Sequence, residues 1–347
     1  AALAEKAQIQ FGCTMLGLSS IPTDHPLNMG MLGMHGNLGP NINTNKADVI
    51  LAVGMRFDDR VTGATSKYAP NAKIIHIDID SSEFDKTIKS DVHIHGNAKT
   101  VLRKLAEKVK ANRHDEWVSS FSRHAKVEKE RVMEREINAS TPDGKMLMGE
   151  VISKVSNAFK HDAILVTDVG QNQMFSVRYF SFTKPRSVIS SGGLGTMGFG
   201  LPASIGAKIA EPNRNVVLFV GDGGLQMTIE ELGMIMEYNV GVKIVLLNNN
   251  FLGNVRQWQH LFFNSRYSAT PMVNPDFKTL ASAYGIPALD VAHRDMLDAA
   301  IETMVNTEGA FLLNVNIDET DMVFPMTPGG HGVDEILLNA TEYYKPV

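Results

Sequence analysis

The sequence has one cysteine, no excess of basic residues and no long apolar run, and each shortage excludes a class of protein. Cys13 is alone, so no disulfide forms within the chain, and we expect a small buried hydrophobe rather than a nucleophile. The net charge of -5 argues against a basic face for nucleic acid. No apolar run reaches the roughly 20 residues that cross a bilayer, and no signal peptide opens the sequence. These absences favour a cytoplasmic metabolic protein without a nucleic-acid or membrane partner.

Strand-like and helix-like segments alternate along the 347 residues, which predicts an α/β fold of two units built on parallel sheets. The first unit is predicted at 1–112, with strands at 47–54, 72–79 and 92–95 and a helix at 98–110. Residues 113–144 are dense in charged side chains and predict a solvated helical linker. The second unit, 145–347 with a C-terminal tail, is predicted to hold a complete doubly wound sheet. Its six strands are expected at 163–168, 187–191, 216–220, 242–247, 287–291 and 311–317.

A magnesium site is predicted from Asp222 and Asn249, which stand 27 positions apart. The apolar run 215–220 is typical of a buried parallel strand, and Asp222 follows it within the sequence Gly-Asp-Gly-Gly. A helix at 228–239 and a strand at 242–247 then carry the chain to Asn249. One strand-helix-strand unit returns both side chains to the same sheet edge, where α/β sheets hold ligands. Magnesium takes about six oxygens and needs only one or two protein side chains beside phosphate and water. The alternative is plain turn chemistry, since Asp-Gly and Asn runs both favour turns.

Two further turns of the second unit are expected to approach a ligand. The turn that begins at Asp168 opens a helix after a strand, where backbone N–H groups attract a diphosphate. An N-capped helix without a ligand is the alternative. The stretch from Ser191 to Gly200 has five glycines in ten residues, which lets backbone come close to a ligand.

These features resemble the signature of thiamine diphosphate enzymes, GDG followed by a helix, a strand and NN. Longer motifs resemble the catalytic subunit of the acetohydroxyacid synthase (acetolactate synthase) family over nearly the whole chain. They are LGMHG at 32–36, GMRFDDRVTG at 54–63, HIDID at 76–80, SGGLGTMGFGLP at 191–202, GDGG at 221–224, LNNN at 247–250 and RQWQHLFFNSRYS at 256–268.

The resemblance implies roles for the second unit around thiamine diphosphate and Mg2+. Magnesium would be bound by Asp222, Asn249 and the carbonyl of Phe251. Other cofactor contacts would come from Val169, Gly170, Gln171, Asn172, Gly195, Gly223 and Gly224. Met197 would be the apolar wedge that bends the cofactor, and Trp258 would shape the pocket of the second ketoacid. By themselves a methionine and a helical tryptophan are more often core residues.

In the first unit the resemblance implies a central, FAD-binding type domain that is incomplete at its N-terminus. The FAD would be structural, and its contacts would be Gly33, Met34, His35, Gly54, Arg56, Asp58, Arg60, Asp78, Ile79 and Asn97. Arg60 would steer the carboxylate of the second ketoacid. Without the resemblance, Arg60 reads as a surface residue, Asp78 as a cap and His35 as a loop histidine. His93 and His95 show no metal-ligand set.

The implied reaction condenses pyruvate with a second 2-ketoacid, pyruvate or 2-ketobutyrate, with loss of CO2. The products, 2-acetolactate and 2-aceto-2-hydroxybutyrate, belong to the biosynthesis of branched-chain amino acids, valine and isoleucine among them. A homodimer and a separate regulatory small subunit are the implied partners. The family's N-terminal pyrimidine-binding domain, with the Glu that protonates the cofactor, has no counterpart here. We therefore expect a C-terminal fragment that is inactive alone.

The sequence departs from the family pattern at three asparagines. Asn172 stands in place of His, Asn254 in place of an apolar residue and Asn97 in place of Asp. The first two could change substrate or inhibitor fit, and the third could weaken FAD binding. Three alternatives stay open: another thiamine diphosphate enzyme of the pyruvate oxidase or glyoxylate carboligase type, a non-catalytic cofactor-binding module, and, with the least weight, a nicotinamide dehydrogenase.

Overall fold

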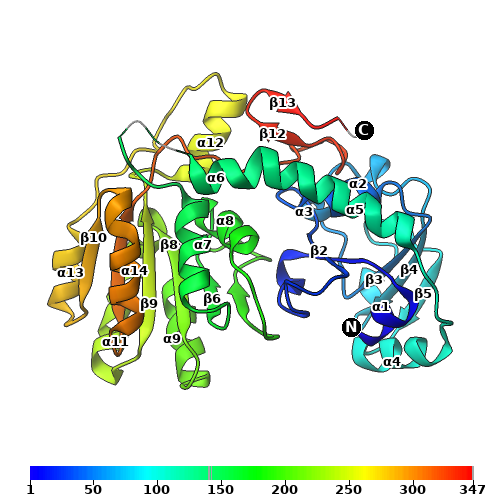
Figure 1. Cartoon of the computed structure of the whole chain (residues 1–347), viewed down its shortest axis with the longest axis horizontal. Coiled ribbons are helices and arrows are strands. Elements are labelled where there is room, and N and C mark those ends of the chain that lie inside the picture. The colour runs from blue at the N-terminus through cyan, green and yellow to red at the C-terminus, as the bar shows by residue number, and fades with distance from the viewer. Residues whose placement is uncertain (140, 142, 346–347) are drawn as a thin grey trace. The chain divides into compact units, whose positions relative to one another are not determined.

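The computed structural model describes residues 1–139, 141 and 143–345, and its internal contacts divide the chain into two units (Figure 1). One unit is Ala1–Val132 together with the segment from Phe324 onward, and the other is Met133–Val323. This division differs from the boundaries at 112 and 144 drawn from the sequence. The C-terminal segment joins the first unit because it is bonded there: the N–H of Thr327 donates to the carbonyl of Met34 at 2.7 Å.

The second unit is built on a six-stranded, all-parallel sheet, as the sequence predicted. Its strands are β6 (Ile164–Thr167), β7 (Val188–Ser190), β8 (Val216–Gly221), β9 (Val242–Asn248), β10 (Ala288–Val291) and β11 (Phe311–Asn316). The order across the sheet is β10-β11-β9-β8-β6-β7. The chain therefore leaves β6 toward β7 on one side and returns as β8 on the other. Such a reversal is a topological switch point, where open α/β sheets bind ligands.

Helices cover both faces of this sheet (Figure 1). The helices of this unit are α6 (Glu134–Asn138), α7 (Met148–Ala158), α8 (Gln171–Tyr179), α9 (Gly200–Ala210), α10 (Asp222–Gln226), α11 (Leu232–Tyr238), α12 (Gly253–Phe262), α13 (Phe277–Ala283) and α14 (Leu297–Asn306). Alternate strand residues such as Leu218 and Ile244 pack with α9, α11 and α13 in one buried cluster. The other face includes Phe219, whose ring lies 6.2 Å from that of Phe180 just beyond α8. Strands buried on both faces explain the continuous apolar runs in the sequence.

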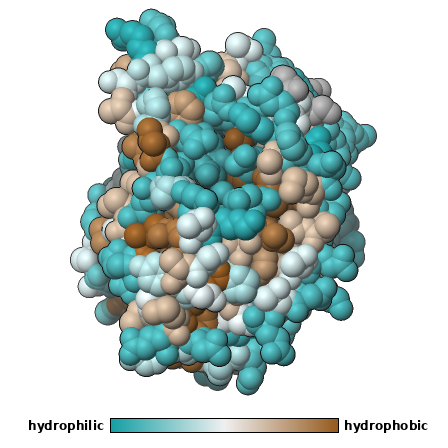
Figure 2. All heavy atoms as spheres, turned by 90° about the vertical axis from the view of Figure 1, so that its left-hand side faces the viewer, coloured by the Kyte–Doolittle hydropathy of each residue, from teal (hydrophilic) through white to brown (hydrophobic). Residues whose placement is uncertain are grey.

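The helix predicted at 228–239 is shorter in the structure. A turn of 3-10 helix, Ile229–Glu231, precedes α11, and Asp222 itself begins the separate short helix α10. Figure 2 shows one side of the molecule, with polar residues over most of the surface and apolar side chains in separate patches. Within the described ranges, no helix is both long and apolar enough to cross a membrane.

The first unit holds a three-stranded parallel sheet in the order β3-β4-β5, formed by Val49–Val53, Lys73–Asp78 and Val92–His95. Two small sheets pair β1 (Phe11–Cys13) with β2 (Asn28–Met31) and β12 (Leu337–Asn339) with β13 (Glu342–Tyr343). The helices are α1 (Ala2–Ala7), α2 (Leu38–Thr44), α3 (Asp59–Thr62), α4 (Ala98–Lys108) and α5 (Asp115–Glu128). The predicted strands and the helix at 98–110 are confirmed within a few residues. Cys13 is buried, as expected.

Within the segment 113–144, predicted as a solvated helical linker, residues 115–138 are helical and mostly exposed or half-exposed, but one face of the helix is buried. Residues 140 and 142 lie outside the described residues. After α5 the helix continues through a π-helical turn, Lys129–Met133, into α6. Within α5, Glu128 is only 2% exposed, and its two carboxylate oxygens accept from Asn37 Nδ2 at 2.8 Å and from the N–H of Leu38 at 2.7 Å. Leu38 begins α2, so a carboxylate meets the positive end of a helix. The buried face could not be predicted from this highly charged segment, because the partners of Glu128, Asn37 and Leu38, lie about 90 residues away.

We expect Glu128→Ala to lower the free energy of unfolding by about 2–4 kcal/mol, since it leaves the buried N–H of Leu38 and the half-buried amide of Asn37 without their acceptor. Urea unfolding of the chain measures this change. Glu130→Ala is the matched control, because Glu130 is exposed and its ion pair with Lys126 spans 3.8 Å. Its effect should stay below about 0.5 kcal/mol. Equal effects for the two variants would contradict a structural role for Glu128.

Candidate functional site

The predicted magnesium ligands follow two neighbouring strands at the switch-point edge of the sheet. In the register of β8 with β9, Gly221 pairs with Leu247. Asp222 directly follows Gly221, and Asn248 and Asn249 directly follow Leu247, so all three leave neighbouring strands at the same level. Adjacent strands lie about 4.8 Å apart, so the backbone at Asp222 and that at Asn249 lie at the same edge of the sheet. Across the switch point, β6 ends at Thr167, and residues 168–172 follow it. The structure thus gathers three of the predicted turns at one edge.

Asp222 is buried, with 1% of its surface exposed. Its Oδ1 accepts from the N–H of Gly223 at 3.0 Å, and its Oδ2 accepts from Asn274 Nδ2 at 2.7 Å. Burial raises the pKa of the Asp222 carboxyl above its ordinary value, although these hydrogen bonds lower it in part. A Cβ at Gly223 would lie 2.8 Å from Leu252 Cδ2 and 3.1 Å from Met272 Sδ, so a side chain there would displace the ends of these two side chains.

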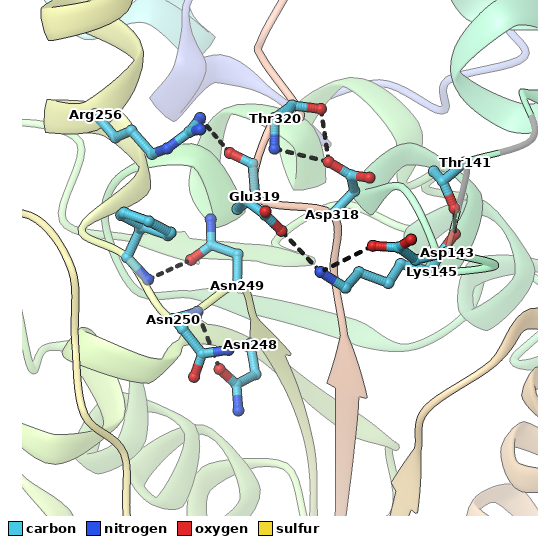
Figure 3. A network of polar contacts seen from close by, with 11 residues as sticks. Thr141, Asp143, Lys145, Asn248, Asn249, Asn250, Arg256, Asp318, Glu319 and Thr320 are labelled. Carbon is cyan, nitrogen blue, oxygen red and sulfur yellow. Dashed lines mark hydrogen bonds and ion pairs between the residues drawn. The ribbon is translucent and has the colours of Figure 1, made fainter. Parts of the chain in front are cut away.

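Asn249 is buried, and its side chain hydrogen bonds to the backbone two residues later. Its Oδ1 accepts from the N–H of Phe251 at 3.1 Å, and Asn248 Oδ1 accepts from the N–H of Asn250 at 3.2 Å (Figure 3). These two local bonds force a tight turn directly after β9. Phe251 also forms a bridge with Pro271, which fixes the backbone around the third predicted ligand, the Phe251 carbonyl.

The turn before α8 presents backbone N–H groups at the same edge. Gly170 has φ of 102° and precedes the helix. Gln171 connects the start of α8 with the asparagine turn, residues 248–251. Gln171 Oε1 lies 3.4 Å from Asn249 Nδ2, and Gln171 Nε2 donates to Gln257 Oε1 at 3.0 Å and to the Asp321 carbonyl at 2.8 Å. Asn172 Nδ2 donates to the carbonyl of Val169 at 2.8 Å.

Asp168 anchors the glycine-rich loop, residues 191–200, to the end of β6 through hydrogen bonds, a role that the sequence did not indicate. It is fully buried, and its carboxylate accepts from the N–H of Val169 at 2.9 Å, of Gly198 at 3.2 Å and of Gly200 at 2.8 Å. Gly224 is its necessary neighbour, because a Cβ there would lie 2.5 Å from Asp168 Oδ1. The glycine-rich loop is thereby held against residues 168–172, the turn predicted to bind the diphosphate.

Two predicted pocket residues border this edge. Met197 lies in the glycine-rich loop and is 38% exposed, and its Cε would be 3.5 Å from a Cβ at Gly223. In the same loop, Gly195 has φ of 64°. Trp258 lies on α12, four residues after Asn254 and so on the same helix face. Asn254 Cβ in turn would be 3.8 Å from a Cβ at Gly170. The Trp258 ring contacts Phe262, with centroids 4.9 Å apart.

The residues predicted for FAD lie in the first unit, and several follow strands of its sheet. Gly54 follows β3, Asp78 ends β4, and Asn97 caps α4 after β5. Gly33, Met34 and His35 form the turn after β2, where Gly33 and Asn41 exchange two hydrogen bonds of 2.8 Å. Arg56 and Ile79 are exposed, and Asp58 caps α3.

Arg60 is an exposed residue of α3 and borders a pocket of the first unit. The lining is Met34, Asp59, Arg60, Gly63, Ala64, Thr327, Pro328, Gly329, Gly330 and Val333. Arg60 and the predicted FAD contacts therefore belong to one unit, and Met197, Trp258 and the asparagine turn to the other.

The edge formed by β6, β8 and β9 fits a diphosphate and a divalent cation. Asp222 is a buried carboxylate with only amide donors around it, so a cation would supply the missing countercharge. Among the residues described, Asn172 Oδ1 and Asn254 Oδ1 are buried without a hydrogen-bond partner. No cluster of three His, Cys, Asp or Glu in the described part of the chain could hold a metal. One carboxylate, one amide and one carbonyl suit magnesium beside phosphate oxygens.

Comparison with protein families agrees with this geometry. Residues 168–315 match the family model "Thiamine pyrophosphate enzyme, C-terminal TPP binding domain", and residues 1–105 match "Thiamine pyrophosphate enzyme, central domain". The chain belongs to the thiamine pyrophosphate enzymes. The C-terminal match begins at Asp168 and includes the turn before α8, the glycine-rich loop and the asparagine turn. It therefore covers the candidate site of the second unit.

Several curated proteins similar to this chain are acetolactate synthases, as the resemblance predicted. The large subunit of isozyme 2 from Escherichia coli K12 is 40% identical over 94% of this chain and 58% of that protein. The large subunit from Lactococcus lactis is 40% identical over 97% of this chain and 57% of that protein. The mitochondrial catalytic subunit from Saccharomyces cerevisiae is 39% identical over 96% of this chain and 50% of that protein. The chain thus spans between half and three-fifths of these relatives.

The glycine-rich loop illustrates why spacing alone does not assign a cofactor. Gly193, Gly195 and Gly198 follow β7 with the G-x-G-x-x-G spacing of a dinucleotide fingerprint. In the structure, however, the N–H groups of Gly198 and Gly200 donate to Asp168, and that of Gly195 donates to the Ser191 carbonyl at 2.8 Å. These donors hold the loop in place and are not free for a pyrophosphate.

A pair of buried carboxyl groups includes Asp321, whose backbone carbonyl accepts from Gln171. Glu136 and Asp321 are 9% and 5% exposed and hydrogen bonded to one another, and the N–H of Met148 donates to Asp321 Oδ2 at 2.8 Å. Burial raises the pKa of Glu136 to about 9 and that of Asp321 to about 7, and the charge of Asp321 adds to the rise at Glu136, which favours a proton shared between them. Asp318 adds a like charge near Asp321, whereas Arg135 and Arg178 oppose the rise at Glu136.

We expect Glu136→Gln to make the chain more stable than the parent above neutral pH. In the parent, the raised pKa values contribute stability that is fully present at acidic pH, below the ordinary carboxyl pKa, and is lost as pH rises through the folded-state values. Glutamine keeps a donor for Asp321 without titrating. The gain at pH 9 should exceed about 1.4 kcal/mol, one pKa unit. Urea unfolding from pH 5 to 9 measures it, with Glu134→Gln, an exposed residue of the same helix, as the control. Parallel pH profiles for parent and variant would rule out the shared proton.

Proposed function

We propose that this chain supplies the magnesium and diphosphate half-site of an acetolactate synthase. The observation that supports this most is the placement of Asp222 and the asparagine turn on neighbouring strands, beside the switch point and the start of α8. The reaction is the condensation of pyruvate with pyruvate or 2-ketobutyrate and the loss of CO2, giving 2-acetolactate or 2-aceto-2-hydroxybutyrate for valine and isoleucine synthesis. When bound, thiamine diphosphate supplies the carbanion chemistry, and the protein supplies orientation and electrostatics.

The residues of the second unit divide this work. Asp222 Oδ, Asn249 Oδ1 and the Phe251 carbonyl hold Mg2+, and the first N–H groups of α8, after Gly170, receive the diphosphate. Asp168 holds the glycine-rich loop in place, so that Gly195 and Met197 border the organic part of the cofactor. Met197 contributes shape rather than charge. Trp258 shapes the pocket for the second ketoacid from the helix face that it shares with Asn254.

The first unit is proposed to bind FAD as a structural group, at the turns that follow β2, β3, β4 and β5. We propose that Asp78, 7% exposed at the end of β4, holds a ribose hydroxyl. Arg60 would steer the carboxylate of the second ketoacid. We also propose a homodimer. A smaller regulatory partner is supported by the names of the relatives, several of which are large subunits.

Calorimetry of the 347-residue chain tests the half-site directly. Thiamine diphosphate should bind in the presence of Mg2+ and bind far more weakly in EDTA, because Asp222 and Asn249 would hold the cofactor through the ion. Equal binding with and without Mg2+ would overturn the assignment of these ligands. Binding of FAD, titrated separately, tests the first unit.

Substitution of Trp258 tests the acceptor pocket in the full subunit that contains this sequence. We expect Trp258→Leu to change the ratio of 2-ketobutyrate to pyruvate used as acceptor by about 10-fold, since one methylene in such a pocket is worth that much. Competition between the two ketoacids measures the ratio. Phe263→Leu, an exposed residue just beyond α12, is the control. An unchanged ratio would favour a different thiamine diphosphate enzyme.

A further inference from the structure

Asn274 connects Asp222 with the asparagine turn through a single amide group. Its Nδ2 lies 2.7 Å from Asp222 Oδ2, 3.0 Å from Asn250 Oδ1 and 3.1 Å from Asn248 Oδ1. An amide carries two N–H bonds, so three acceptors share two hydrogens. The shortest contact is with the ionisable partner, as expected for a charge-assisted bond. The ends of β8 and β9 are therefore joined by a residue of a third segment, the loop between α12 and α13.

The loop holds Asn274 in a fixed orientation. Gln226 Nε2 donates to Asn274 Oδ1 at 2.8 Å, which identifies the nitrogen as the group that faces Asp222. Two backbone bonds pair the loop with the asparagine turn: the N–H of Met272 donates to the carbonyl of Asn250 and the N–H of Leu252 to the carbonyl of Thr270, both at 2.8 Å. These bonds flank Phe251. The same loop thus constrains the carboxylate and the backbone of the predicted carbonyl ligand.

We propose that Asn274 is a positioning residue that restricts Asp222 to coordination through one oxygen and thereby selects Mg2+ over Ca2+. This inference rests on the proposed magnesium site. Asp222 Oδ1 already accepts from Gly223, and Oδ2 is occupied by the shorter bond to Asn274. These two bonds restrict rotation of the carboxylate, so offering both oxygens to one ion would require the Asn274 bond to break or lengthen.

The difference between the two ions follows from their coordination. Mg2+ requires a compact octahedron and takes carboxylates through one oxygen, whereas Ca2+ accepts six to eight ligands and readily binds a carboxylate through both oxygens. Loss of the Asn274 donor frees Asp222 Oδ2 and allows the second mode. Loss of an outer partner of this kind typically weakens metal affinity about 10- to 100-fold. That loss should fall on Mg2+, whereas Ca2+ gains a compensating contact.

The test measures metal affinity and not turnover. Thiamine diphosphate is titrated into the 347-residue chain by calorimetry over a series of Mg2+ or Ca2+ concentrations, for the parent, Asn274→Ala and Asn274→Asp. We expect Asn274→Ala to bind Mg2+ about 10- to 100-fold more weakly, with less than about a 3-fold change for Ca2+. Asn274→Asp keeps the side-chain shape but has no N–H, so its ratio of Ca2+ to Mg2+ affinity should also rise.

Thr279→Ala serves as the control, because it removes a 2.7 Å bond to Asp276 at the start of α13 without a contact to Asp222. Its ion ratio should equal that of the parent. If the Asn274 variants weaken both ions equally, or neither, the positioning role is wrong while the magnesium site stands. If the parent itself binds no thiamine diphosphate with Mg2+, the proposed function fails, and this inference fails with it.

Discussion

Asp222→Asn is expected to weaken Mg2+-dependent binding of thiamine diphosphate by at least about 100-fold, more than the loss of an outer-sphere partner. The substitution keeps the size of the side chain but removes the only negative charge of the predicted ligand set. Because Asp222 is 1% exposed, water cannot replace it easily. The remaining amide and carbonyl oxygens are neutral and hold Mg2+ poorly. Calorimetry of the chain with thiamine diphosphate and Mg2+ measures the loss.

The same substitution should leave the fold intact. Burial raises the pKa of the Asp222 carboxyl, so its charge is less favoured in the folded chain than in the unfolded chain and adds no stability to the fold. Asparagine still accepts through its oxygen, and urea unfolding should change by less than about 1 kcal/mol. Asp162→Asn is the matched control, since Asp162 lies at the opposite end of β6 and pairs with Lys184 on the surface at 2.8 Å. Weak cofactor binding in both variants would point to a general defect instead of a lost ligand.

Asp168→Ala is expected to lower the free energy of unfolding by about 2–4 kcal/mol, because three backbone N–H groups lose their charged acceptor. Two of these donors, on Gly198 and Gly200, are themselves buried. The glycine-rich loop should lose its anchor, and hydrogen exchange across 191–200 should accelerate. Urea unfolding and exchange together measure these effects.

A purely local change would give a different pattern. Asp162→Ala removes an exposed carboxylate from the start of the same strand region and should cost less than about 1 kcal/mol. If Asp168→Ala destabilises the chain no more than this control, the loop is held by other contacts. If stability falls but exchange in 191–200 is unchanged, Asp168 acts on the strand end alone.

The parts of the fold that the sequence predicts are those with short-range causes. The strand before Asp222 is an unbroken apolar run because both faces of the sheet are covered, and its end is marked by glycine. The return of Asn249 to the same edge follows from one strand-helix-strand unit. The register of β8 with β9 therefore confirms that these residues share an edge, which local pattern and connection rules alone had indicated.

The parts that it does not predict depend on distant partners. Asn274 reaches Asp222 across 52 positions, and Asp168 reaches Gly200 across 32, through loops without a periodic pattern. Glu128 reads as one more charge in a charged helix, yet its acceptor role is set by a helix start about 90 positions away. Polar side chains satisfied at long range leave no local signal, because their composition equals that of a solvated surface.

The central claim is that Asp222, Asn249 and Phe251 jointly hold the divalent ion of the cofactor. A crystal structure of the chain with thiamine diphosphate and Mn2+ tests it most directly, because the anomalous signal locates the ion. We expect one peak bound by Asp222 through one oxygen, by Asn249 Oδ1, by the Phe251 carbonyl and by two phosphate oxygens. An ion bound to the diphosphate but to neither Asp222 nor Asn249 would contradict the account.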